Sequence, residues 1–427
     1  MRSFFLRNIA GERGRDFGSL RVARPGSLIL CVLIGSILAT SVEAGGLYVN
    51  EFSTTSQSNS GAGRGAWAPD ASATLHNPAS MTRIDDHGFA GGFSLLFGDI
   101  HFDSETGADG GNQAGVAPIA SFSYAHKVSD RVRFGFSFFS ISGSILSPSN
   151  DWAGRSQLTE LSLLTISMTP TLAIRLTDWL SVGGGPVITY GVLNWNLRAP
   201  TEDFVRLNDL DDWEASGRIG FVLHPRDDFS LSVFYNSKTD FSLNGEFNGP
   251  ASLNPDLDLD LPLAQFVEVS GYWQATEKVA LLATFNWEDW SVADDLSVQL
   301  GPAPPTQATT GFKDTYKIAV GANYQLNEDW LLQTGISYDT SALQNKNRIA
   351  ALPIDEQIRF SLGGIYSLTE STNVGLSFVY VNLGQGEIRT GAVEGDYQRN
   401  HAFVFGFSLA FKELPWAGKW TYDSDSI

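Results

Sequence analysis

The strongest constraint on the fold is a repeated alternation of apolar with small or polar residues. Over residues 401–411 nearly every second residue is a large apolar one, and the residues between them are mostly small. Residues 315–324 repeat the pattern. Such alternation predicts β-strands whose two faces meet different surroundings. From residue 86 onward no segment has helical spacing, so we expect an all-β fold.

The connections between these segments alternate strictly between short and long. Short polar turns are expected at 127–131, 176–179, 224–228, 275–278, 326–330 and 368–372. Longer loops are expected at about 99–114, 146–158, 197–212, 244–264, 291–311, 340–355 and 386–398. This order predicts a transmembrane barrel of about fourteen antiparallel strands, with short periplasmic turns and long outer loops. A soluble all-β repeat protein is the alternative, but it does not explain the alternating connection lengths. Aromatic residues beside the connections, expected to form the two interfacial belts, include Trp179, Trp195, Trp213 and Trp290.

Composition agrees with a barrel and excludes other classes. The 427 residues carry a formal charge of −19, which argues against nucleic-acid binding. After the N-terminal region no apolar run is long enough for a membrane-spanning helix. The mean hydropathy of −0.06 fits strands with one lipid-facing and one polar face.

Residues 1–44 have the organisation of a signal peptide. Several arginines precede an apolar run at 28–38, and small residues lead to a cleavage site after Ala44. A membrane anchor is the alternative, but the run is short and interrupted by Gly35. The only cysteine, Cys31, lies in this segment, so we expect a mature chain without disulfides.

Residues 45–84 do not alternate and are rich in glycine and polar residues. They are too polar to cross lipid, and a lumen about fourteen strands wide is not filled by its own side chains. We therefore expect 45–84 to be a plug (hatch) inside the lumen. Residues 85–411 would form the barrel, and 412–427 a periplasmic tail.

The plug segment resembles the N-terminal hatch of the outer-membrane long-chain fatty-acid transporter family (FadL/TodX type). The matching pieces are 46–48, 60–65, 70–73 and above all 77–81, where the family usually has glycine in place of Ser80. The hatch motif consists of Asn77, Pro78 and Ala79. The resemblance implies that hydrophobic substrates enter at the outer loops and occupy a pocket in the barrel. They then leave sideways through a gap made by a kink in the third strand.

We expect the third strand at about 132–145. It is rich in apolar residues, including Phe136, Phe138 and Ile141, and Gly143 lacks a side chain where a bend could form. The alternative is an ordinary strand glycine at position 143. Three prolines are rival points of disruption, because proline cannot donate to the strand ladder: Pro118, Pro170 and Pro186.

Charged side chains predicted to face the lumen are candidates for binding an acidic head group. By strand parity the basic ones are Arg175, Arg218, Lys317 and Arg359. The acidic ones are Glu214, Glu268 and Glu288. Lys317 is the preferred carboxylate partner and Arg359 the second. The alternative is that these groups pair with one another and brace the wall, since buried charges usually pair.

Other chemistry finds little support. Residues 253–261 place aspartates at alternate positions, but the glycine and glutamate of a calcium loop are missing. We interpret them as a solvated outer loop, with loose divalent-cation binding as the alternative. The six histidines lie in no recognisable nucleophile motif, so an outer-membrane phospholipase is disfavoured. We expect no catalytic residue, no metal site and no cofactor.

The sequence thus predicts an outer-membrane protein of a Gram-negative bacterium for uptake of long-chain fatty acids or other hydrophobic compounds. The sequence has no phosphate-binding loop, so we expect transport by passive diffusion. The lateral exit is what the family resemblance implies. A toluene-like hydrocarbon channel of the same family, a general porin and a surface structural barrel are the alternatives. We expect a monomer in contact with outer-membrane lipid and lipopolysaccharide.

Overall fold

The computed structural model describes residues 48, 53–140, 143–199, 201, 203–250, 254–343, 345–353 and 355–412. The predicted signal peptide, residues 413–427 of the predicted tail and Ile141 lie outside the described residues.

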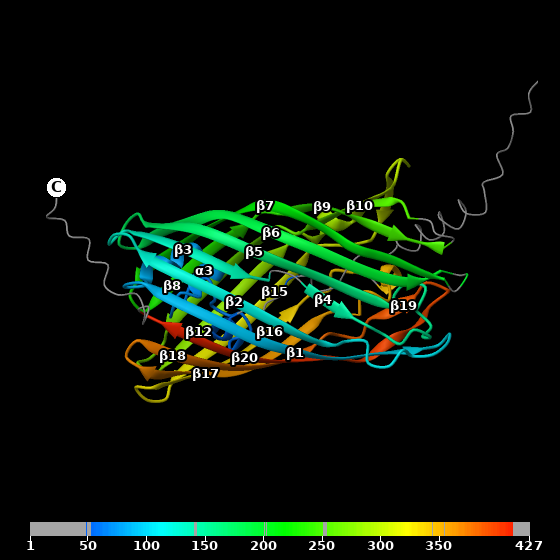
Figure 1. The fold of residues 1–427 in the computed structure, drawn as a ribbon. Coiled ribbons are helices and arrows are strands. Elements are labelled where there is room, and N and C mark those ends of the chain that lie inside the picture. The colour runs from blue at the N-terminus through cyan, green and yellow to red at the C-terminus, as the bar shows by residue number, and fades with distance from the viewer. Residues whose placement is uncertain are drawn as a thin grey trace, which may run out of the picture. The chain divides into compact units, whose positions relative to one another are not determined.

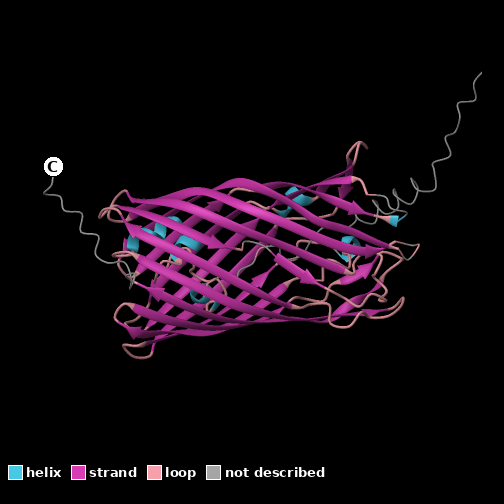
Figure 2. Cartoon of the chain, viewed as in Figure 1, coloured by secondary structure: helices cyan, strands magenta, loops and turns pink. Residues whose placement is uncertain are grey.

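A closed antiparallel barrel of fourteen strands forms the wall in the described part of the chain (Figures 1 and 2). Eight of these are single elements: β1 (Gly88–Ser104), β2 (Val116–Lys127), β5 (Glu160–Arg175), β6 (Leu180–Arg198), β7 (Phe204–Arg226), β16 (Trp330–Asp339), β17 (Gln357–Thr369) and β20 (Glu394–Phe411). Six are divided in two: β3 (Val132–Phe139) and β4 (Gly143–Leu146), β8 (Phe229–Asn236) and β9 (Thr239–Asn248), β10 (Asp256–Leu263) and β11 (Phe266–Gln274), β12 (Val279–Glu288) and β13 (Asp295–Leu300), β14 (Thr306–Thr309) and β15 (Thr315–Gln325), β18 (Thr372–Asn382) and β19 (Glu387–Arg389). The first strand, β1, pairs with the last, β20, and so closes the barrel.

The alternation in sequence becomes a difference between the two wall faces. In β15 the side chains of Ile318 and Val320 are exposed on the outside, whereas Lys317 and Ala319, which alternate with them, are buried. Outward apolar side chains suit a surface that faces lipid. The all-β barrel predicted from sequence is therefore confirmed.

All six predicted short turns are confirmed, since each separates two consecutive wall strands. The prediction of long loops is partly wrong. Strands β6 and β7 leave only a short connection within 197–212, and β10 occupies Asp256–Leu263 within the loop predicted at 244–264. In β10 the leucines are buried and the aspartates exposed, so this is a two-faced strand that pairs with β9. Aspartate disfavours strands, which concealed this alternation from sequence reasoning.

Residues 53–84, here called the N-terminal segment, lie against the inner face of the wall and are almost entirely buried. They contain three short helices: α2 (Thr54–Gln57), α3 (Ala73–His76) and η1 (Pro78–Arg83). Two more short helices, η3 (Trp290–Ala293) and η4 (Asn345–Asn347), follow wall strands. No helix in the described residues is long and apolar enough to span a membrane.

The predicted aromatic belts need one correction. Trp179 and Trp213 are exposed, as expected for interfacial residues, but Trp195 and Trp290 are fully buried. The Trp290 indole donates to Glu288 and packs against Tyr48, with ring centroids 5.2 Å apart. Proximity to a connection does not fix the face on which a side chain lies.

Candidate functional site

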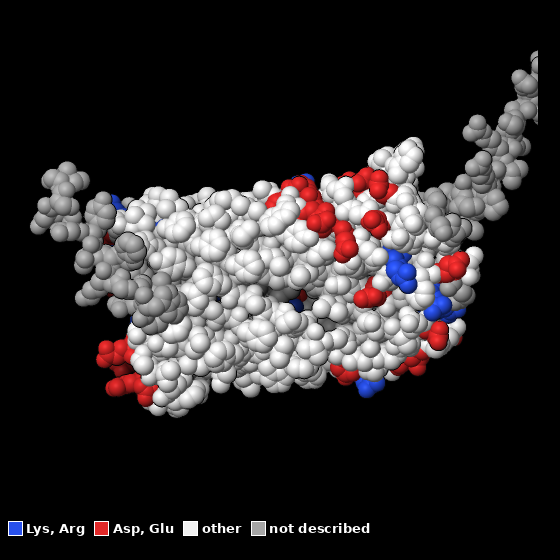
Figure 3. All heavy atoms as spheres, viewed as in Figure 1, with Lys and Arg blue, Asp and Glu red and all other residues white. Residues whose placement is uncertain are grey.

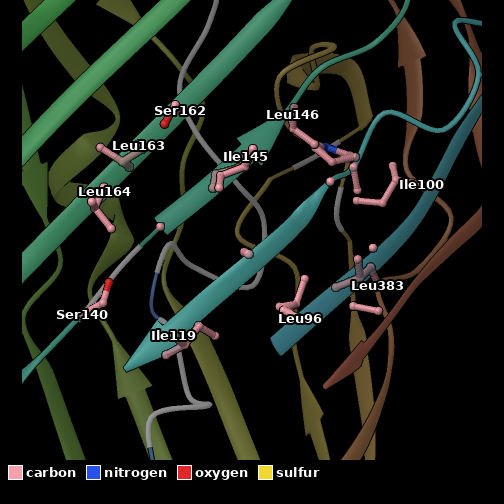
Figure 4. Close-up of a pocket in the computed structure, with 18 of the residues that line it drawn as sticks. Leu96, Ile100, Ile119, Ser140, Ile145, Leu146, Ser162, Leu163, Leu164 and Leu383 are labelled. Carbon is pink, nitrogen blue, oxygen red and sulfur yellow. The ribbon is translucent and has the colours of Figure 1, made fainter. Parts of the chain in front are cut away.

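A cavity of about 340 Å³ lies inside the wall near β2 and β4 (Figure 4). This volume falls within the range of small-molecule binding sites, roughly 300–1,000 Å³. Most of the larger lining side chains are aliphatic: Leu96, Ile100, Ile119, Ile145, Leu146, Leu163, Leu164 and Leu383. Polar groups include Tyr48, Gln357 and Arg359. The cavity is therefore apolar with a small polar part.

The cavity reaches the outer surface through a break in the strand ladder. Strand β2 pairs with β3 only as far as Ser121 opposite Phe139. Beyond this pair, β4 pairs with β5 and, within the described residues, has no ladder with β2. An isolated bridge between Ala114 and Leu146 bounds the other end of the break. We call this gap, between residues 115–120 and β4, the wall opening.

The wall opening connects the lumen with the lipid-facing surface. Ile145 and Leu164 line the cavity and are more than 40% exposed on the outside, whereas Arg359 lines it from the inside and is buried. Figure 3 shows the wall hollowed at this level, with charged atoms visible inside the hollow. At this point the cavity therefore extends from the lumen to the lipid-facing surface.

An extra residue in the third strand accompanies the opening. The chain advances four residues from Phe139 to Gly143, but the partner strand β5 advances only three, from Ser167 to Leu164. This offset is that of a β-bulge, which bends a strand and reverses the faces of its side chains. Accordingly, outward side chains have even numbers in β3 and odd numbers in β4.

The residues predicted for a lateral opening fall on both sides of this bulge. Phe136 and Phe138 belong to β3, and Phe138 is exposed on the outside. Gly143 begins β4 and lines the cavity. Pro118 of β2 lies across the opening and also lines the cavity. Gly143 and Pro118, which the sequence offered as alternative points of disruption, therefore both border the same gap.

Of the predicted basic lumen residues, only Arg359 lines the cavity. Its guanidinium donates to Asp339 Oδ2 at 2.5 Å and to Gln357 Oε1 at 2.6 Å. Lys317 Nζ lies 3.9 Å from Asp339 Oδ1, deeper in the wall and beside Gly61 of the N-terminal segment. Both cations thus share one carboxylate, and Arg359 is the one at the cavity surface.

The other two predicted cations contact the N-terminal segment. Arg218 donates to the carbonyls of Thr74 and Leu75, each at 3.3 Å. Arg175 donates to the carbonyl of Thr82. Arg218 and Arg175 therefore lie where the segment meets the wall and are not among the residues that line the cavity.

The hatch motif sits directly on two wall glycines. Asn77 Oδ1 accepts the Ala79 N–H at 3.0 Å, and its Nδ2 donates to the Phe221 carbonyl at 3.2 Å. Pro78 occupies the first turn of η1, where its missing N–H costs nothing. A Cβ at Gly220 would lie only 2.0 Å from Asn77 Oδ1, and one at Gly183 2.6 Å from the Ala79 nitrogen. Sequence reasoning missed these glycines, whose signal is a glycine on the lumen face of a strand.

In the part of the chain that the structure describes, no three histidine, cysteine or acidic side chains are grouped to hold a metal ion. The aspartates of β10 alternate along one exposed face of a strand. The mainly aliphatic lining of the cavity is suited to binding an apolar molecule.

Comparison with known proteins places this geometry in context. A family model described as "Outer membrane protein transport protein (OMPP1/FadL/TodX)" matches residues 35–412. The long-chain fatty acid transport protein of Escherichia coli O6:H1 is 24% identical over 437 residues, covering 88% of this chain and 96% of the relative. That of Salmonella typhi is 25% identical, with the same coverage.

Solved structures share the fold. A FadL homologue of Pseudomonas aeruginosa matches with a TM-score of 0.79 and 19% identity, covering 86% of this chain and 99% of the other. The Ralstonia pickettii toluene transporter TbuX matches with a TM-score of 0.67 and 15% identity, covering 85% and 99%. Since the family model spans most of the sequence, the chain belongs to the OMPP1/FadL/TodX family of outer membrane transport proteins.

Proposed function

We propose that this protein carries long-chain fatty acids or other hydrophobic compounds into the cell by passive diffusion. The substrate would occupy the cavity and leave sideways through the wall opening, without any chemical change. The observation that carries the proposal is an apolar cavity that crosses the wall between β2 and β4.

The physical argument is the cost of exposing apolar surface to water. Each Å² of apolar surface kept in water costs about 25 cal/mol, so an aqueous pore gives a greasy molecule no favourable path. A route lined by Leu96, Ile145 and Leu164 that ends at a lipid-facing surface avoids this cost. Relatives named as long-chain fatty acid transport proteins and toluene transporters support the same substrate range.

We further propose that residues 45–84 act as a plug that closes the lumen to water and ions. The described part, the N-terminal segment, is buried and bound to the wall by hydrogen bonds such as Gln333 Nε2 to Asn59 Oδ1 at 2.7 Å. A plugged lumen distinguishes a selective transporter from a general porin.

The polar part of the cavity suits an acidic head group. Arg359 supplies charged donors at the cavity surface, and Lys317 adds positive charge behind it through the shared Asp339. An acyl chain would lie along the aliphatic lining. Arg359 is therefore the first candidate to bind a fatty-acid carboxylate. We also propose a monomer whose outer face contacts lipid and lipopolysaccharide.

Uptake by whole cells tests the proposal. A strain without its own transporter would express the chain and be supplied with radiolabelled oleate or toluene in separate assays. Faster uptake than in the empty strain is expected for oleate; faster uptake of toluene alone would identify a hydrocarbon channel. Large ion currents through the intact purified protein, without uptake of either compound, would instead indicate a general porin.

A further inference from the structure

One outer connection folds into the barrel instead of covering its surface. Residues 340–356 join β16 to β17, and the consecutive residues 348–353 within this connection are all buried. Arg348, Ala350 and Ala351 have no exposed surface at all. Loops normally run over the surface, because a buried loop must find partners for its backbone polar groups. We call residues 348–353 the loop insert.

The loop insert lies on the outer side of the cavity. Its last residue, Pro353, lines the cavity together with Leu383 and Arg359. Strand β17 begins at Gln357, just after the insert, and runs from there to the short turn at 368–372. The insert therefore lies beyond the outer end of β17, on the side from which a compound outside the cell reaches the cavity.

Both ends of this connection leave the wall at the same place. Asp339 at the end of β16 pairs with Gln357 at the start of β17. Long connections that contain little regular structure, and whose ends lie close together, are often lids or binding loops. Because the two ends are already paired, the loop insert can move without any change in the pairing of the wall strands.

Side chains from other parts of the chain hold the loop insert by its backbone. The Ala350 N–H donates to Gln157 Oε1 at 2.9 Å, and the Ala350 carbonyl accepts from the Tyr397 hydroxyl at 3.0 Å. The Asn400 amide donates to the Pro353 carbonyl. These contacts take the place of a strand ladder, since residues 348–353 belong to no described strand.

The one charged residue of the loop insert pairs within its own connection. Arg348 Nη2 lies 3.0 Å from Asp355 Oδ1. The Arg348 side chain also packs against Gly386, where a Cβ would lie only 2.8 Å from Arg348 Cδ. Since Arg348 and Asp355 belong to the same connection, their ion pair can be kept when the insert moves. The contacts with Gln157, Tyr397 and Asn400 are neutral hydrogen bonds, and each changes an equilibrium constant only about fivefold.

We propose that the loop insert is a gate over the outer side of the cavity. The hydrogen bonds from Gln157, Tyr397 and Asn400 hold the gate closed, and a substrate enters when the insert moves outward. Closure keeps the apolar lining away from water. This inference rests on the proposed function, because a gate on this side serves only compounds that enter the cavity from outside. Entry past the gate and exit through the wall opening would then be separate steps.

A reversible tether tests the gate. Because Cys31 is the only cysteine and precedes the predicted cleavage site, Gln157→Cys and Ala350→Cys would supply the only thiols of the mature chain. The two residues are in contact, so a short bifunctional thiol reagent can join them while the insert is closed. Oleate uptake should fall at least about tenfold after cross-linking and return when a reductant cleaves the linker.

A second tether at the outer end of the barrel is the matched control. Asp295 of β13 pairs with Thr309 of β14, and both residues are exposed. Cross-linking of Asp295→Cys to Thr309→Cys with the same reagent should leave oleate uptake unchanged. Full uptake by the tethered Gln157→Cys/Ala350→Cys protein would overturn the gate.

Release of the gate is measured by the reactivity of a buried thiol. In an Ala351→Cys background, Tyr397→Phe removes the hydroxyl that donates to Ala350 and should raise the rate of thiol modification about fivefold. The initial rate of oleate uptake well below saturation should rise with it. Tyr235→Phe is the matched control, because the Tyr235 hydroxyl donates to Gln265 at 2.7 Å, away from the insert.

An Ala319→Cys thiol, buried on the inner face of β15, reports any general loosening of the barrel and should stay protected in every variant. Heat-dependent mobility in electrophoresis checks folding, and Asn400→Leu offers a second release variant. Equal modification of Ala351→Cys with and without both release substitutions would overturn the hydrogen bonds as the closure. Absence of oleate uptake by the unmodified chain would contradict the proposed function, whereas the thiol reaction still reports whether the insert opens. The two proposals can therefore fail separately.

Discussion

The wall differs sharply between its seam, where β1 meets β20, and its opening, where β2 faces β4. At the seam the ladder runs from Phe89 opposite Phe411 to Ser104 opposite Gly395, with one irregularity. Neither seam strand contains proline. At the opening one strand carries Pro118 and its neighbour an extra residue. Strands with the same two-faced alternation therefore pair along their length at the seam and leave a gap at the opening.

The inner faces of the two regions differ as well. Near the seam, Gln57 of the N-terminal segment donates to Ser94 Oγ at 2.8 Å and accepts from Ser377 Oγ at 2.6 Å. At the opening the inner face is an apolar cavity. The seam region binds the segment with polar contacts, and the opening region leaves room for a ligand. A substitution in one region should therefore leave the other region unchanged.

The largest expected effect comes from filling the opening. Gly143→Phe places an aromatic ring at the outer mouth of the cavity, on the face of Ile145 and Leu164, and a Cβ there meets only the Leu163 carbonyl, at 3.4 Å. Oleate uptake should fall about tenfold or more, equivalent to at least about 1.4 kcal/mol, while the melting temperature stays the same. Gly217→Phe is the matched control, because a Cβ at Gly217 meets nothing within 4 Å and the residue does not line the cavity. Equal uptake by both variants would show that the opening is not used.

The second effect concerns the contact between the N-terminal segment and the wall. Gly220→Val would force Asn77 from its position, because its Cβ would lie 2.0 Å from Asn77 Oδ1. Overpacking of this kind costs about 1–3 kcal/mol. We expect single-channel ion conductance in planar bilayers to rise, whereas the Gly217→Val control stays closed. A Gly220→Val barrel that is folded and still closed would contradict the plug.

The third effect separates the two cations that share Asp339. A lost hydrogen bond to a charged group costs about 1.5–3 kcal/mol, so Arg359→Gln should weaken oleate binding at least about tenfold. Binding of a neutral hydrocarbon should remain. The double variant Arg359→Gln/Asp339→Asn removes both charges and tests whether the loss reflects an unpaired Asp339 instead.

Lys317→Ala should have a smaller effect on oleate binding than Arg359→Gln, because Lys317 is not among the residues that line the cavity. Fluorescence competition with purified protein measures both variants. Stronger loss with Lys317→Ala would restore the order of preference drawn from the sequence. No loss in either variant would remove the head-group assignment altogether.

The smallest effect is a pH dependence of the N-terminal segment. Burial, and then the charges of Arg64 and Arg218, lower the pKa of His76 well below 6.5. His76 stays neutral while the N-terminal segment is bound to the wall and becomes protonated when the segment is released. This difference stabilises the bound segment above pH 6.5. That stability declines as the pH falls below this value, by up to about 1.4 kcal/mol per pH unit. The protection factors of residues 53–84, which correct for the pH dependence of intrinsic amide exchange, should therefore fall between pH 7 and pH 5.5, and His76→Gln should abolish the change.

Much of this architecture could be predicted from sequence, for a physical reason. A strand between lipid and lumen must alternate apolar with small or polar side chains, and the short turns between strands consist mainly of polar residues. The barrel and its six turns could therefore be predicted from sequence. Beyond the membrane neither medium is lipid, and β10 alternates buried leucine with exposed aspartate, a residue that disfavours strands and is typical of loops. The long loops were therefore overestimated.

The sequence indicated which types of residue face the lumen, but it did not indicate where along the barrel each of them lies. Parity predicts the face on which Arg175, Arg218, Lys317 and Arg359 lie, but it does not predict their height along the barrel. Height decides whether a cation meets the N-terminal segment, as Arg218 does, or the cavity, as Arg359 does. Pairing across the wall also decides that Pro118 borders an opening, while the strands on both sides of Pro186 keep their register past it. Both depend on register, which a single sequence does not contain.

Photolabelling shows whether a substrate passes through the wall opening. A long-chain fatty acid with a diazirine group along its chain would be supplied to cells, irradiated during uptake, and its attachment sites mapped by mass spectrometry. If the substrate passes through the cavity, we expect labels on Leu96, Ile145 and Leu164, which line it from the lumen to the lipid-facing surface. We also expect loss of these labels in Gly143→Phe. Labels confined to the outer loops or to the N-terminal segment, with uptake intact, would contradict this route.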